Sequence, residues 1–185
     1  MTLLLGIVSA AALQVATPAF NTYQADLIPA DTPATRRPRA IEHSDGYYLR
    51  LAIHRDASYA MVPLFVAEYA LGQSLFAHPP GSDATRTAHG IVGAGLVGLF
   101  AVNTVTGAWN LWDSRHDPSP PSRTRRYLHA ALMLAADAGF VATEATAPGR
   151  RTAVTDPSRR RLHRTLAITS MGLAVGGFGM MLIWK

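Results

Sequence analysis

The sequence predicts an all-α integral membrane protein, a four-helix transmembrane bundle with one additional transmembrane helix at its amino terminus. Of the 185 residues 49% are hydrophobic, and the mean hydropathy of the chain is positive. The charged residues gather in the connecting segments, whereas a soluble domain would carry them along one face of each helix. A helix that crosses a bilayer needs about 20 mostly apolar residues. Five stretches approach or reach that length: Thr2–Phe20, Ala57–Phe76, Gly90–Trp112, Leu128–Ala147 and Thr165–Trp184.

The first 46 residues are predicted to lie outside the bundle. Residues 1–20 lack the positive residues that open a signal peptide, so we expect a retained transmembrane helix that ends near Pro18. Residues 21–46 contain several prolines and an Arg-Arg-Pro-Arg run without an apolar period, which predicts an irregular loop. Residues 47–185 are predicted to form the bundle, because apolar character resumes at Tyr47.

The connections between the last four stretches predict how the bundle is ordered. The run His78-Pro79-Pro80-Gly81 predicts a tight turn that stops a helix, and the prolines of residues 117–122 predict an extended loop. Residues 148–161 are basic and polar. Short connections between long helices imply antiparallel neighbours, so successive helices are expected to begin at opposite ends of the bundle.

Four histidines stand at the amino-terminal ends of the last four apolar stretches. In an up-and-down bundle, His54 and His129 fall on one membrane side, and His89 and His163 fall on the other. Two histidines that face each other across a helix bundle can hold a haem iron from both axial positions. The four residues are therefore predicted to be the iron ligands of two haem b groups.

Small residues recur where such haems would need them. A helix returns to the same face after about 18 residues, so an inward histidine implies a second inward position near the opposite haem. That position is Gly72 counted from His54, Gly107 counted from His89 and Ala147 counted from His129, while Gly177 lies 14 residues after His163. A flat porphyrin face favours small residues there. Close helix packing in membranes favours them too, and that alternative stays open.

Arginines flank the histidines. Arg55, Arg126, Arg161 and Arg164 are placed to pair with haem propionates. The alternative is that they mark the cytoplasmic side of the membrane, as basic loops commonly do. Such loops also favour contacts with lipid headgroups and argue against nucleic acid as a partner.

Two acidic residues within the apolar stretches have several possible roles. Glu68 lies 14 residues after His54, near the same inward face, and could relay a proton, contact a quinone or bond to a neighbouring helix. Asp137 is rotated about 80° from His129, which predicts a helix–helix contact with Asn103 or Thr143. Structural roles are favoured for both acids.

The remaining three histidines are expected outside the two sites. His78 is expected at the surface in its proline turn, although it shares an end with His89 and could replace a ligand. His43 and His116 lie in polar segments and are expected to be solvated. The chain has no cysteine, which excludes c-type haem attachment and cysteine-ligated iron–sulfur clusters.

The alternation of histidines over four successive helices resembles cytochrome b561 and related four-helix di-haem b-type cytochromes. The segments Tyr127-Leu128-His129-Ala130 and Leu162-His163-Arg164-Thr165-Leu166-Ala167 are the most similar. In that family the first and third core helices bind one haem, and the second and fourth bind the other. The resemblance covers residues 47–185 and implies the pairs His54 with His129 and His89 with His163. No ascorbate-site or ferric-reductase signature is present, so no substrate is implied.

The expected function is transmembrane electron transfer by a b-type cytochrome with two bis-histidine haems. Such a chain would be a carrier or a subunit of a larger membrane redox complex, exchanging electrons with a quinone or a partner protein, and not a stand-alone enzyme. The basic residues are arginines except for Lys185, a bias typical of GC-rich bacterial genomes, so we expect a multi-pass protein of the bacterial inner membrane.

Two alternatives stay open. The first is a non-redox scaffold subunit that packs against a partner complex through the glycines of residues 172–179. The second is a quinone- or proton-handling membrane anchor with one haem or none, in which Glu68 and one histidine pair would do the work.

Overall fold

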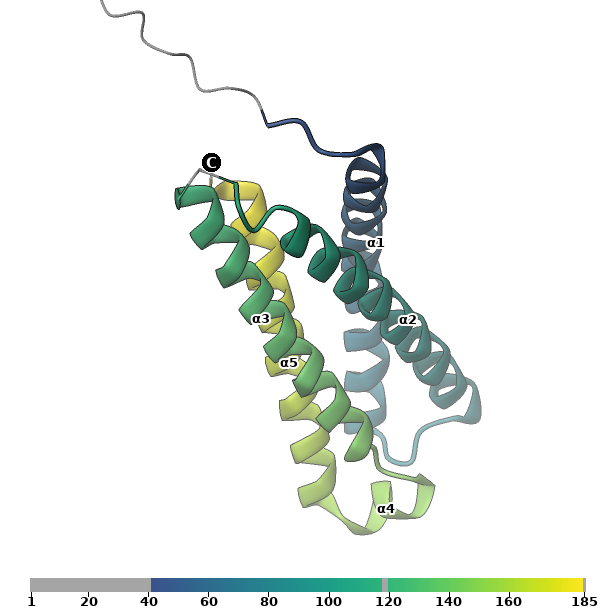
Figure 1. The fold of residues 1–185 in the computed structure, drawn as a ribbon. Helices are drawn as coiled ribbons and strands as arrows, with labels where there is room; N and C mark the ends of the chain where they lie inside the picture. Colours follow the sequence, from purple (N-terminus) through teal and green to yellow (C-terminus); the bar gives the residue numbers. More distant parts are fainter. Residues whose placement is uncertain (1–40, 118–119, 185) are drawn as a thin grey trace, which may run out of the picture. The chain divides into compact units, whose positions relative to one another are not determined.

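The computed structural model describes residues 41–117 and 120–184, which are helical and contain no strand (Figure 1). The five helices are α1 (Asp45–Ala77), α2 (Asp83–Asp113), α3 (Pro120–Ala145), α4 (Arg150–Thr155) and α5 (Pro157–Ile183). Four of them, α1, α2, α3 and α5, are long and apolar enough to cross a membrane. The all-α class and the four long bundle helices are thus confirmed. The predicted helix over residues 1–20 and most of the loop over 21–46 lie outside the described residues.

Each long helix begins roughly two to three turns before its apolar stretch. Polar caps explain the starts of α1, α2 and α5, because a side-chain oxygen accepts a hydrogen bond from a free backbone N–H of the first turn. Ser44 accepts from Tyr47 N at 3.3 Å, and Ser82 accepts from Thr85 N at 3.1 Å. Asp156 caps α5 in the same way, with Pro157 at the first helical position.

The predicted loop boundaries were therefore partly wrong. Residues 45–46 and 120–122 are helical, and the polar segment 148–161 contains α4 and the start of α5. Apolar stretches mark the part of a helix that suits a membrane, whereas the caps decide where the helix begins. The four histidines consequently lie within the helices, roughly two turns beyond their first residues.

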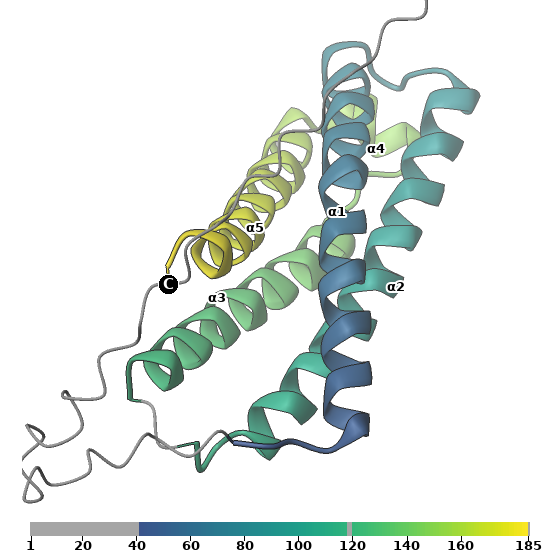
Figure 2. The same ribbon diagram turned by 90° about the horizontal axis from the view of Figure 1, so that it is seen from above.

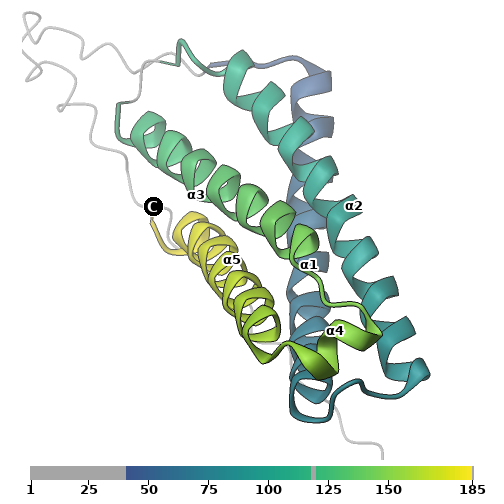
Figure 3. The ribbon, with the colours of Figure 1, turned by 90° about the horizontal axis from the view of Figure 1, so that it is seen from below.

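The long helices form two pairs. Helix α1 packs along α2, and α3 packs along α5, as the views of Figures 2 and 3 show. The two pairs touch each other less, through α1 with α5 and through α2 with α3. Helix α1 therefore lies diagonally across the bundle from α3, and α2 lies diagonally across from α5.

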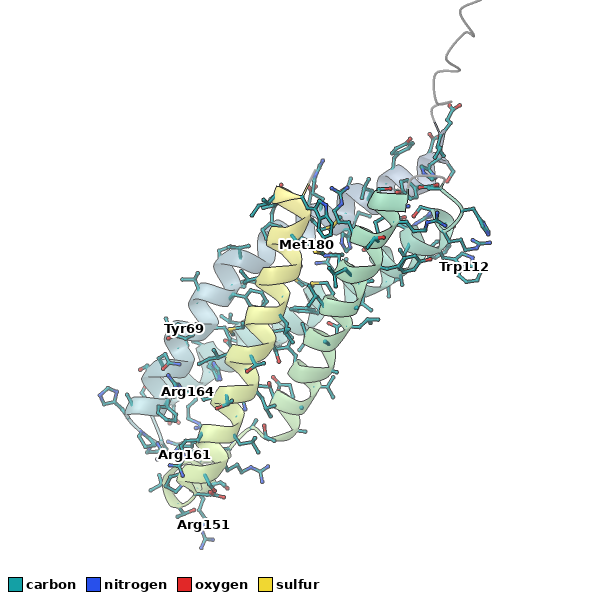
Figure 4. The ribbon with its side chains drawn as sticks, turned by 90° about the vertical axis from the view of Figure 1, so that its left-hand side faces the viewer. Tyr69, Trp112, Arg151, Arg161, Arg164 and Met180 are labelled. Atoms are coloured by element: carbon teal, nitrogen blue, oxygen red, sulfur yellow. The ribbon has the colours of Figure 1, made fainter. Side chains whose placement is uncertain are left out.

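The two ends of the bundle differ in their side chains. We call the end where α1 and α3 begin end one, and the end where α2 and α5 begin end two. Figure 4 shows Trp112 and Met180 toward end one, and Arg151 and Arg161 at end two. Between the ends the outer surface is apolar, with side chains such as Val66, Ile91 and Val141 about two-thirds exposed or more.

The core is a thin layer at the middle of the bundle. It consists of Met61 and Phe65 of α1, Leu96 and Phe100 of α2, Ala136 of α3 and Ala174 of α5. The rings of Phe65, Phe100 and Phe140 pack on one another with centroids 4.7 to 6.0 Å apart. We call these three residues the phenylalanine layer. They lie between the histidines of end one and those of end two.

Candidate functional site

The structure brings the four helix histidines together in two pairs. At end one, the ring centroids of His54 and His129 are 6.1 Å apart and the ring planes are at 79°. At end two, the centroids of His89 and His163 are 6.4 Å apart and the planes are at 77°. Each pair joins diagonal helices, α1 with α3 and α2 with α5. These are the pairs that the sequence predicts.

In three of the four histidine rings, Nδ1 forms a hydrogen bond with a backbone carbonyl oxygen. His54 Nδ1 lies 3.1 Å from Asn103 O, His129 Nδ1 lies 3.0 Å from Gly177 O, and His163 Nδ1 lies 2.9 Å from Thr143 O. A carbonyl oxygen only accepts, so the proton of each neutral ring is on Nδ1 and the free lone pair is on Nε2. Histidines that bind metals usually have this arrangement, because the second nitrogen fixes the tautomer and the ring orientation.

The fourth ring has a different neighbour. His89 Nδ1 lies 2.9 Å from Oε1 of Glu68, a side chain of α1 that is only 12% exposed. The two atoms are at ion-pair distance, but the N–H bond of the ring does not point along the line between them. The second carboxylate oxygen, Oε2, is buried and has no hydrogen-bond partner among the described residues.

The predicted glycines lie against the histidines, each on a neighbouring helix. A Cβ built on Gly107 would stand 2.9 Å from Cε1 of His54, and one built on Gly72 would stand 3.5 Å from Cε1 of His89. Gly177 has the same relation to His129, with 3.7 Å to Nδ1. These glycines make room for imidazole rings and let them approach a helix backbone. The sequence predicts the positions, but the contact found is with the histidine ring.

A large cavity opens beside the histidine pair of end two. Its volume is about 890 Å³, within the range of small-molecule and cofactor sites. His89, His163 and Gly72 line it, and it extends to Phe100 and Phe140 of the phenylalanine layer. At end one, the cavity among the described residues beside His129 is only about 20 Å³. The two ends are therefore alike in their histidines and unlike in the space around them.

The predicted arginines divide into two groups. Arg164 lines the large cavity, donates to Gln73 Oε1 at 3.1 Å and lies over the ring of Phe76. Arg126 lies one turn before His129 and bonds to Asp117 at 2.9 Å. Arg55 is largely exposed and pairs with its neighbour Asp56, and Arg161 is exposed.

Two arginines of the cavity were missed. Arg86 lines it and donates to Pro80 O at 3.2 Å, and Arg160 lines it and donates to Phe76 O at 3.1 Å. The Nε atom of Arg160 is buried without a partner among the described residues.

A spacing signal could have found the missed arginines. Arg86, Arg126 and Arg160 each stand three residues before a histidine, and Arg50 stands four residues before His54. Residues three or four apart share a helix face, so each arginine stands one turn nearer the end of the bundle than its histidine.

The other polar predictions have mixed outcomes. Asp137 does contact another helix, but its partner is Thr104, whose hydroxyl donates to Oδ2 at 2.6 Å, and not Asn103 or Thr143. His78 is exposed at the end of α1, as expected. His43 is not solvated, because its ring stacks on Tyr47 and lies 3.6 Å from Asp117.

The described residues contain no group of three or more His, Asp or Glu side chains that could hold a metal ion. A metal bound by protein ligands alone is therefore not indicated in that part of the chain. A haem needs fewer protein ligands than a free metal ion, because the porphyrin nitrogens bind the iron and two side chains are enough. No protein-family model, curated protein or solved structure matches this chain.

Proposed function

We propose that this protein is a membrane-spanning b-type cytochrome that transfers electrons between two haems. The observation that carries the proposal is the spacing of the two histidine pairs, 6.1 and 6.4 Å between ring centroids. An imidazole nitrogen lies about 2 Å from a bound metal and about 1 Å from its own ring centroid, so two axial rings stand about 6 Å apart. Three rings have Nδ1 bound to a backbone carbonyl, which leaves Nε2 for the iron, and Nδ1 of the fourth ring lies 2.9 Å from Glu68.

The proportions of the four long helices support a place in the bilayer. Helices of 26 to 33 residues are about 39 to 50 Å long, more than the hydrocarbon core of about 30 Å. Soluble monomers rarely expose continuous apolar surface on this scale. Trp109 and Trp112, both more than half exposed toward end one, fit the aromatic belt at a membrane interface. The arginine-rich composition favours a bacterial inner membrane.

The surroundings of the cavity at end two suit a haem. Its wall is mainly apolar, and Arg86, Arg160 and Arg164 are among the residues that line it. Guanidinium groups bind carboxylates in a bidentate way, so these arginines would hold the propionates. Gly72 leaves the face of the pair free of bulky side chains, as a flat macrocycle requires.

The arrangement favours electron transfer over substrate chemistry. When bound, the haem iron supplies a one-electron couple whose potential follows its axial ligands and surroundings. The two histidines of each pair would hold the iron from both sides, which suits electron transfer and not binding of oxygen or a substrate. The two pairs are 14 residues apart along α5, from His163 to the level of Gly177 beside His129, which is about 21 Å. A carrier or a subunit of a larger membrane redox complex fits this layout.

The test is a reduced-minus-oxidised visible spectrum of the purified full chain, with haem measured per polypeptide. Two haem b per chain are expected, and alanine at any of His54, His129, His89 or His163 should remove one haem and leave the other. His78→Ala is the matched control, because His78 is exposed at the same end as His89 and should leave both haems. A colourless wild-type protein would overturn the proposal and favour a scaffold subunit.

A second candidate uses the same cavity for a quinone. Glu68, Asp137 and Thr104 all line it, and polar groups in an apolar cavity can orient a quinone carbonyl. One haem per chain, retained only at end one, together with quinone in the purified protein would favour this reading.

A further inference from the structure

The four histidines differ in what holds Nδ1. Backbone carbonyls hold His54, His129 and His163, whereas a carboxylate, that of Glu68, stands beside His89. We propose that Glu68 is a positioning residue that acts through His89 and gives the haem of end two the lower reduction potential. This inference rests on the proposed function. It implies a direction, because electrons then pass downhill from end two to end one.

Glu68 is an unusual residue for its location. It lies in the interior of α1, 14 residues after His54, and its side chain is only 12% exposed, beside His89 of α2. The adjacent Gly93 has no side chain, and a Cβ built there would stand 3.2 Å from Oε1 of Glu68. Burying a carboxylate in an apolar span costs free energy, so such residues in membranes usually serve a function. Its unpaired Oε2 also fits a role other than helix packing.

A carboxylate changes a histidine ligand more than a carbonyl does. Glu68 Oε1 lies 2.9 Å from Nδ1 of His89, so a ring whose N–H turned toward it would give up its Nδ1 proton more readily than to a carbonyl, which would make Nε2 a more basic ligand. A more basic ligand stabilises the oxidised iron, which carries one more positive charge than the reduced iron. The negative charge of the carboxylate acts in the same sense, and reduction potentials depend on such local charge and hydrogen bonding. Both effects lower the potential of end two alone.

The other three histidines serve as an internal comparison for His89, because a backbone carbonyl and not a carboxylate lies beside their Nδ1. His163, on the other side of the same cavity, is held by Thr143 O, and both rings of end one are held by carbonyls. Glu68→Gln keeps the shape of the side chain and one oxygen acceptor but removes the charge. The variant should therefore make end two resemble end one.

Asp137→Asn is the matched control. Asp137 lines the same cavity and accepts a hydrogen bond from Thr104, but no contact joins it to either histidine in the described structure. It loses the same charge from the same cavity wall. A difference between the two variants therefore isolates the effect that passes through His89.

The experiment is a potentiometric titration of the full chain in detergent, with the two haems assigned through His129→Ala and His163→Ala. Glu68→Gln should raise the lower midpoint potential by at least about 59 mV, which is a tenfold change for a one-electron couple, and leave the other unchanged. Asp137→Asn should shift it less. Two haems with potentials that Glu68→Gln leaves unchanged, shifts equally, or shifts no more than Asp137→Asn would overturn the inference alone.

Loss of haem from the wild-type chain and loss of haem from the Glu68→Gln variant lead to different conclusions. A wild-type chain without haem overturns the proposed function itself. If Glu68→Gln binds haem only at end one, Glu68→Asp decides, since it keeps the carboxylate on a shorter side chain. A haem at end two with a potential below that of end one supports the role of Glu68. An equal or higher potential, or no haem at end two, overturns it.

Discussion

Gly107 of α2 lies directly against the ring of His54 on α1. A Cβ at this glycine would stand 2.9 Å from Cε1 and 3.3 Å from Nδ1 of the histidine, closer than side chains normally approach. The ring in turn bonds to the carbonyl of Asn103, one turn before the glycine on the same helix. The absence of a side chain at one position thus allows the hydrogen bond that orients the ring.

Gly107→Ala should therefore disturb end one. The added methyl has to push the ring away from Asn103 O, and overpacking of this kind costs about 1 to 3 kcal/mol. We expect the variant to lose the proposed haem of end one and to melt at a lower temperature, as measured by haem content and thermal unfolding. Gly98→Ala, in the same helix, adds a methyl where no atom lies within 4 Å. A Gly107→Ala protein with both haems and unchanged stability would contradict the argument.

Two adjacent arginines should behave differently. Arg160 lines the cavity with a buried Nε, whereas Arg161 is exposed. Arg160→Gln should weaken haem retention at end two by about tenfold or more, since hydrogen bonds to charged groups are worth about 1.5 to 3 kcal/mol. Arg161→Gln should leave it unchanged. Haem loss to a scavenging apoprotein measures both, and equal loss from the two variants would argue against a propionate contact at Arg160.

The ring planes predict a spectroscopic signature. The imidazole planes are close to perpendicular in both pairs, at 79° and 77°. Perpendicular axial rings leave two iron d orbitals nearly equal in energy, which produces a highly anisotropic low-spin signal in electron paramagnetic resonance. We expect both proposed haems to give that signal when they are oxidised. A rhombic signal from either haem would mean that its rings turn toward parallel when iron binds.

The cap of α5 predicts a dependence of stability on pH. Hydrogen bonds from the Ser158 hydroxyl and from Arg159 N lower the pKa of Asp156 below its usual value of 3.8. Because the folded pKa is depressed, the stabilisation is present above the unfolded pKa and is lost as pH falls through the folded value. The melting temperature should therefore drop below about pH 4. Asp156→Asn keeps a cap and should remove this component, so identical pH profiles would refute the assignment.

The sequence predicts the helices and the histidine pairs well because both depend on coarse spacing. Apolar stretches of about 20 residues and short connections leave few arrangements, and these bring His54 near His129 and His89 near His163. The first bundle helix begins within two residues of the predicted Tyr47, whereas α2 and α5 begin before their apolar stretches because Ser82 and Asp156 cap them there.

Two further errors are one residue wide. Arg160 lines the cavity and its neighbour Arg161 does not, and the partner of Asp137 is Thr104 and not Asn103. Neighbouring residues on a helix point about 100° apart, so a one-residue error changes the face completely. Hydropathy does not fix that angle. Counting back three residues from His163 would have identified Arg160.

The three residues of the phenylalanine layer stand at the same distance in sequence from the histidine of their own helix. Phe65, Phe100 and Phe140 each follow a histidine by 11 residues, which is about three turns and the same helix face, and the fourth position is the small, buried Ala174. Three packed rings form an apolar layer between the two ends, while the polar side chains of Glu68, Thr104 and Asp137 line the cavity beside it. Electrons can tunnel through such a layer, whereas protons need hydrogen-bonded water to pass. The proposed electron path between the two histidine pairs would therefore cross an apolar aromatic layer, whereas a proton path would have to follow the polar wall of the cavity.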